Sequence, residues 1–101
     1  MKSKIINNNL LEIDRIIHEP ARLLILCYLY VVEGMDFMFL MNQTGLTQGN
    51  LSAHLTKLEE AGYVTIKKEF INKRPNTMIS ISVSGQKAFE KYCKEIKEYL
   101  L

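Results

Sequence analysis

Residues 45–64 read GLTQGNLSAHLTKLEEAGYV, a stretch that begins with polar residues, becomes helical and ends at a glycine. Leu51, Leu55 and Leu58 recur at the spacing of one helix face, so we expect them to face a core. Thr47 is suited to cap a helix over residues 48–61, and Gly62 is suited to end it. The opposite face carries small, weakly charged residues, which raises the question of what that face meets.

The preceding residues predict more helices. FMFLMNQT (37–44) reads as a helix with Asp36 as N-cap and Gly45 as its end, so the turn TGLT (44–47) joins two helices as in a helix-turn-helix. LLEIDRIIH (10–18) has helical spacing. ARLLILCYLYVVE (21–33) is apolar almost all round, which is typical of a buried central helix.

After Gly62 the period of the sequence changes. YVTIKKEF (63–70) and TMISISVS (77–84) alternate in the manner of half-buried strands, and the polar INKRPN (71–76) between them predicts a hairpin with a basic tip. Ser84 is expected to cap a last helix that runs to the end of the sequence. The predicted order is α-α-α-α-β-β-α, mainly α with a small β-hairpin, in a single domain over residues 1–101.

Composition and charge narrow the classes of function. The chain has 101 residues, of which 48% are hydrophobic, and a formal net charge of +2, as expected of one globular domain. It has no long apolar run and no secretory signal pattern, so we expect a cytoplasmic protein. The positive charge is concentrated in one stretch. Residues 63–76 contain four cations and one anion, Glu69; the cations are Lys67, Lys68, Lys73 and Arg74.

These features together predict a DNA-binding surface. The major groove, about 12 Å wide, admits a helix whose approaching side lacks bulky residues, and Gln and Asn side chains can pair with an adenine edge. The helix over 48–61 is the candidate for this groove, and the hairpin over 70–77 is the candidate for the backbone or the minor groove. The candidate contacts are Thr47, Gln48, Asn50, Ser52, Ala53, Thr56 and Lys57 on the helix, and Lys67, Lys68, Lys73 and Arg74 on the hairpin.

Three segments carry a family resemblance: IHEPARLLIL, LTQGNLSAHLTKLEEAGYV and KKEFINKRPNTMISISVSGQKAFEKY. From about Ile17 to Tyr99, the chain resembles the winged helix-turn-helix transcriptional regulators of the small MarR/ArsR-like type. The resemblance implies a winged-helix fold and a homodimer on a roughly palindromic operator, with the fourth helix in the major groove. Metal-binding ArsR-type regulators carry a cysteine motif in the helix before the recognition helix, and FMFLMNQT has no cysteine or histidine, so metal sensing is not carried over.

The terminal helices are the candidates for dimerisation, because a domain this small has limited interior in which to bury every apolar stripe. A dimer would also place two copies on one palindrome. The predicted interface residues are Leu10, Ile13, Ile17, Phe89, Tyr92, Ile96, Tyr99 and Leu100. Repression is the outcome expected of a small dimer with no activation domain.

Catalysis, cofactors and metals have no support in the sequence. Cys27 and Cys93 lie in apolar patterns without metal-like spacing to His18 or His54, so we expect buried thiols and leave any redox role open. His54 is expected to pack against the hairpin or its first strand. The alternative function is a winged helix used for protein–protein contact, which would show little salt dependence.

Overall fold

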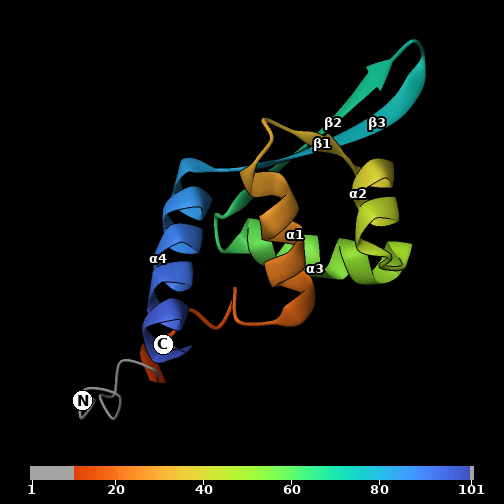
Figure 1. Cartoon of the computed structure of the whole chain (residues 1–101). Coiled ribbons are helices and arrows are strands. Elements are labelled where there is room, and N and C mark those ends of the chain that lie inside the picture. The colour runs from red at the N-terminus through yellow and green to blue at the C-terminus, as the bar shows by residue number, and fades with distance from the viewer. Residues whose placement is uncertain (1–10, 101) are drawn as a thin grey trace.

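The computed structural model describes residues 11–100. Its elements are α1 (Pro20–Tyr30), β1 (Met35–Asp36), α2 (Phe37–Thr44), α3 (Gln48–Glu60), β2 (Val64–Ile71), β3 (Arg74–Ile81) and α4 (Val83–Leu100). The strands form one antiparallel sheet in the order β1-β3-β2, and the β2–β3 hairpin projects from the body of helices (Figure 1). The predicted fold, a winged helix made mainly of α-helices with a small hairpin, is confirmed.

The core lies where α1, α3 and the base of the sheet meet. Leu51, Leu55 and Leu58 are buried as their spacing predicts, so α3 is fixed along one whole face. α1 packs against α2, α3 and β3, which confirms its central position. The fully buried side chains are Ile17, Ile25, Leu26, Leu29, Leu40, Leu51, Leu55, Leu58 and Ile79.

Residues 11–18 do not form the predicted helix, and Leu10 lies outside the described residues. Asp14 explains the difference, because its Oδ1 accepts hydrogen bonds from the backbone N–H groups of Ile16 and Ile17, at 2.9 and 3.1 Å. A short side chain that bonds its own backbone competes with helical hydrogen bonds. The segment is therefore a series of turns that still directs Ile13 and Ile17 into the core.

Strand β1 was not predicted from the sequence. Its two residues are too few to show a period, and Met35 and Asp36 pair with Ile79 and Met78 of β3. This pairing draws the chain away from the helix, so α1 ends at Tyr30 and not near residue 33 as predicted. Asp36 also caps α2 as predicted, since its side chain accepts from the Phe39 N–H at 2.9 Å.

The last helix begins earlier than predicted. Its cap is Ser82, whose Oγ accepts from the Gly85 N–H at 2.9 Å, and not Ser84. The Ser82 hydroxyl donates to the Gly62 carbonyl at 2.6 Å, and its backbone N–H donates to the Tyr63 carbonyl at 3.0 Å. The start of α4 is thereby fixed to the turn that follows α3.

Cys27 and Cys93, predicted to be buried, are exposed free thiols. Both cysteines lie in apolar helices as predicted, but their neighbours Leu26 and Tyr92 occupy the buried side of each helix. In an apolar helix such as α1, periodicity does not identify the side that faces the core, so only the tertiary packing decided it.

Candidate nucleic-acid interface

The candidate interface begins with the N-terminus of α3. The Thr47 side chain accepts from the Asn50 N–H at 3.1 Å, which confirms Thr47 as N-cap. Gly45 has a φ of 74°, a left-handed conformation that turns the chain from α2 into α3. The remaining N–H groups of the first turn and the positive end of the helix dipole are available to an anion.

The outward face of α3 is accessible along its length. Every residue that the sequence analysis assigns to this face is exposed, whereas the three leucines of the opposite face are buried. The Thr56 hydroxyl donates to the Ser52 carbonyl at 3.0 Å, so its oxygen still has acceptor capacity toward a ligand. The exposed residues are Thr47, Gln48, Asn50, Ser52, Ala53, Thr56 and Lys57.

His54 does not pack against the hairpin as predicted. Its Nδ1 lies 3.2 Å from Nη1 of Arg22 and 3.8 Å from Oε1 of Glu19, which are residues at the start of α1. The Arg22 Nε also donates to the Ile16 carbonyl at 2.5 Å. This polar cluster connects the flank of α3 with α1 and with the turns before α1. It therefore helps to fix the orientation of α3 relative to α1.

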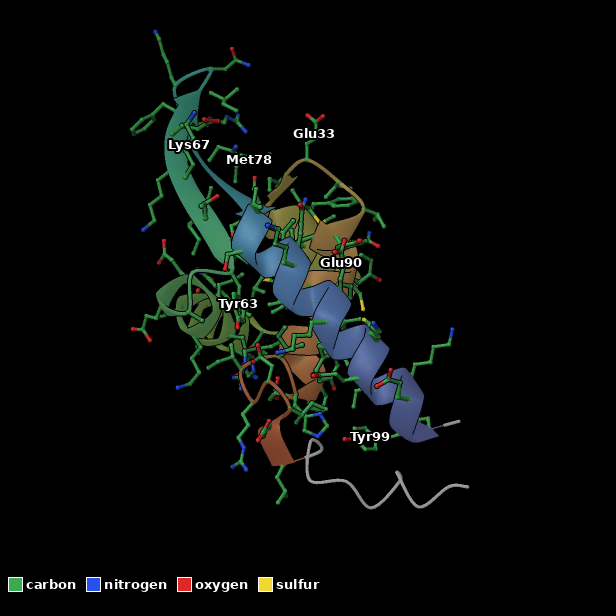
Figure 2. The ribbon with its side chains drawn as sticks, turned by 90° about the vertical axis from the view of Figure 1, so that its left-hand side faces the viewer. Glu33, Tyr63, Lys67, Met78, Glu90 and Tyr99 are labelled. Atoms are coloured by element: carbon green, nitrogen blue, oxygen red, sulfur yellow. The ribbon has the colours of Figure 1, made fainter. Side chains whose placement is uncertain are left out.

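The two lysines of β2 lie on opposite faces of the hairpin. Side chains alternate along a strand, so Lys68 shares a face with Ile66, and Lys67 lies on the other face, where Figure 2 shows it next to Met78. Lys68 lines a hollow together with residues of α3, whereas the Lys67 Nζ lies 3.6 Å from Oε2 of the half-buried Glu69. The structure therefore joins Lys68 to the α3 surface and separates Lys67 from it.

The hollow between α3 and the sheet has a volume of about 680 Å³. It includes Gln48, Ser52 and Thr56 from the predicted set. Five other lining residues lie outside the predicted site: Phe37, Leu55, Glu59, Ile66 and Thr77. Helical spacing from Ser52 through Thr56 could have found Glu59, whereas Phe37 and Thr77 belong to other elements that only the fold brings close.

The tip of the hairpin is a two-residue turn. Asn72 and Lys73 have φ values of 53° and 65°, and Ile71 pairs with Arg74 on either side. Positive φ at both central residues is the geometry that matches the twist of the flanking strands. Lys73 and Arg74 are exposed here as predicted. Phe70 and Ile71, which were not predicted as site residues, are also exposed, at 75% and 49%.

The predicted dimer residues fall into two groups. Ile13, Ile17, Phe89 and Tyr92 are covered by their own domain, with exposures of 8% or less, so they offer little surface to a second copy. Ile96 and Tyr99 are half-buried and Leu100 is 77% exposed, so the accessible part of the predicted set lies at the end of α4.

Residues 11–100 contain neither a metal-binding cluster nor a membrane-spanning helix. No group of three or more His, Cys, Asp or Glu side chains is arranged to hold a metal ion there. No helix in that range is long and apolar enough to cross a membrane.

The chain is similar to known proteins over most of its length. A family model described as a winged helix DNA-binding domain matches residues 21–100. MJ0432 of Methanocaldococcus jannaschii, which is described as an uncharacterized protein, is 43% identical over 82 residues, which are 81% of this chain and 89% of that protein.

Solved structures of transcriptional regulators are also similar to this chain over most of its length. The structure of a transcriptional regulator homologue from Pyrococcus horikoshii OT3 is similar with a TM-score of 0.80 and 27% identity, over 96% of this chain and 90% of that one. NolR from Sinorhizobium fredii is similar with a TM-score of 0.63 and 30% identity, over 93% and 85% of the two chains.

Proposed function

We propose a function for this chain that starts from its family. The chain belongs to the winged helix DNA-binding domain family and is a DNA-binding transcriptional regulator. The proposal is that it binds a specific operator and represses transcription. In this proposal a homodimer occupies a palindromic sequence. Helix α3 of each copy enters the major groove, and the β2–β3 hairpin follows the backbone or the minor groove.

One observation carries the proposal. The small polar face of α3 is exposed along its whole length and adjoins Lys68 across a shared hollow, with Lys73 and Arg74 at the end of the same hairpin. A helix with a small, weakly charged front and basic groups beside it has the shape and charge that a groove between two phosphate backbones requires.

The side chains can be given distinct roles in this arrangement. Gln48 and Asn50, in the first turn of α3, are suited to bidentate pairing with adenine, and Ser52 can bond several base edges. Lys57 and Lys68 are suited to phosphates, which position the protein without reading sequence. Arg74 is suited to the minor groove, where narrow segments attract arginine.

A dimer is proposed because one copy would read only a single half-site. Two copies related by a twofold axis would read half-sites roughly 10 base pairs apart, one turn of the duplex. The exposed end of α4, with Leu100 and the half-buried Ile96 and Tyr99, is the surface proposed for this contact.

The alternative, a winged helix that contacts another protein, draws some support from the exposed apolar side chains of Phe70 and Ile71 on the hairpin. Salt dependence separates the two functions. Binding to DNA releases counterions from the phosphates and weakens steeply as salt rises, whereas an apolar protein contact does not.

The test is selection of bound fragments from genomic DNA, followed by titration of the recovered duplex at several salt concentrations. We expect a palindromic sequence and an affinity that falls by about a thousandfold or more between 50 and 200 mM salt, given six or more phosphate contacts. A failure to retain any duplex at low salt would contradict DNA binding. Recovery of fragments with no shared sequence would contradict operator recognition alone.

A further inference from the structure

Two thiols lie outside the candidate nucleic-acid interface, one on α1 and one on α4. Cys27 of α1 and Cys93 of α4 are both free and exposed, and neither lines the hollow beside α3. The nucleic-acid interface therefore gives them no role.

Contacts between α1 and α4 fix the register of the two helices. The Tyr30 hydroxyl donates to the Glu90 carboxylate, and the Tyr30 and Phe89 ring centroids are 5.1 Å apart. The helices run in opposite directions (Figure 1), and Glu90, labelled in Figure 2, is the α4 residue that contacts Tyr30 of α1.

This register brings the two cysteines to the same level. Cys27 lies three residues before Tyr30, and Cys93 lies three residues after Glu90. In antiparallel helices these steps move in the same direction by the same distance, about 4.5 Å. Residues three apart also share a helix face, so each cysteine lies on the side of its helix that makes the Tyr30–Glu90 contact.

Electrostatics agrees with this placement. Burial raises the pKa of the Cys93 thiol, and the charge of Cys27 raises it further. Cys93 in turn contributes to the raised pKa of Tyr30, after the hydrogen bond to Glu90, burial and the charge of Glu90. Cys93 is thus within electrostatic range of both Cys27 and Tyr30.

We propose that Cys27 and Cys93 form a reversible disulfide that joins α1 to α4. The oxidant is a low-molecular-weight disulfide. One cysteine thiolate attacks a sulfur of that disulfide, which gives a mixed disulfide and releases one small thiol; the second cysteine then attacks the protein-bound sulfur and releases the other. Two protein thiols are oxidised, one external disulfide is reduced to two thiols, and the two protons leave with them.

The bond would close a loop that contains α2, α3 and the whole hairpin. Closing a loop of this length restricts the unfolded chain, so the oxidised protein should melt at a higher temperature than the reduced one. This proposal does not depend on DNA binding, since every measurement that tests it is made on the protein alone.

The experiment treats the reduced full chain with oxidised glutathione at neutral pH, once folded and once in urea. We expect the folded chain to lose two hydrogens by intact mass and to give a peptide that links Cys27 to Cys93, with reversal by dithiothreitol. The linked form should appear on the order of tenfold faster in the folded chain, because folding holds the thiols together. Equal rates in both states would overturn the proposal.

Two single variants serve as controls. Cys27→Ser and Cys93→Ser should each stop at one attached glutathione, because the second attacking thiol is missing. In the wild type, a product with two attached glutathiones, or a covalent dimer, would also overturn the proposal. The comparison of folded and unfolded wild type stands by itself if either variant fails to fold.

Discussion

Asp14 shows how one side chain positions several others. Its Oδ1 accepts from two backbone N–H groups, and its Oδ2 accepts from the Tyr63 hydroxyl at 2.5 Å. Tyr63 follows the end of α3, so this bond fixes the turns before α1 to the segment that leads into the hairpin (Figure 2). Burial, the hydrogen bond to Asp14 and the charge of Asp14 raise the pKa of Tyr63 from 10.0 to about 12.

The raised pKa of Tyr63 predicts a loss of stability in alkali. The folded state favours the neutral phenol, so the contribution to the free energy of unfolding is complete below pH 10 and falls as pH rises toward about 12. We expect urea unfolding of the wild type and of Tyr63→Phe to differ more at pH 8 than at pH 11. A constant difference would contradict this, because other titrating groups are common to both proteins.

Asn50 provides a residue-scale test of base recognition. We expect Asn50→Ala to lose ~1–3 kcal/mol of discrimination at one base pair of each half-site, since an asparagine–adenine pair would be removed. Lys57→Ala is the contrast, because a lost phosphate contact weakens binding to all sequences alike. Titration against a panel of single-base operator variants makes the comparison; equal patterns for the two variants would argue against the assignment of Asn50.

At the scale of elements, α4 depends on one close approach. A Cβ added at Gly85 would lie 2.1 Å from the Tyr63 carbonyl oxygen, in a part of the chain where backbone and side chains are already fixed. We expect Gly85→Ala to lower the free energy of unfolding by ~1–3 kcal/mol or more, as overpacked substitutions do. Denaturant unfolding measures it.

Gly49 offers the matched control for Gly85. It also lies in a helix, but a Cβ there would meet nothing within 4 Å. Gly49→Ala should therefore leave stability unchanged or raise it by up to ~1 kcal/mol, through helix propensity. Equal stability of the two variants would contradict the close contact between Gly85 of α4 and the Tyr63 carbonyl oxygen.

The hairpin is an element whose charge can be removed without disturbing its turn. Lys73 has a positive φ, so Lys73→Gly preserves the geometry, and Arg74→Ala removes the second charge. We expect this double variant to weaken binding to every duplex and to reduce the salt slope by about two, if both cations contact phosphates. Lys94→Ala with Lys97→Ala on α4 removes the same charge elsewhere and should leave the slope nearly unchanged.

At the scale of the whole molecule, the proposed dimer depends on the end of α4. Leu100 is 77% exposed, so Leu100→Lys should not damage the domain itself. We expect the variant to dissociate at higher concentrations than the wild type in sedimentation experiments, and to bind a full operator less tightly. Glu98→Lys, which also changes an exposed residue of α4, is the control. A wild type that is monomeric at every concentration would contradict the dimer.

The sequence alone determined the parts of this protein that depend on local rules. The spacing of three leucines, the cap at Thr47 and the glycines at 45 and 62 predicted α3 and its boundaries to within a residue, because a period and a cap act over a few residues. The alternation in residues 63–84 likewise predicted the hairpin, and these elements together predicted the fold.

Only the tertiary structure decided the relations between elements distant in sequence. It added β1, joined the turns around Asp14 to Tyr63, brought Lys68 next to α3, and placed Cys27 and Cys93 on exposed sides of their helices. It also buried four side chains predicted for the dimer interface. The physical reason is that a periodic pattern indicates which side of an element faces a neighbour. Only the packing of the whole chain decides which element that neighbour is.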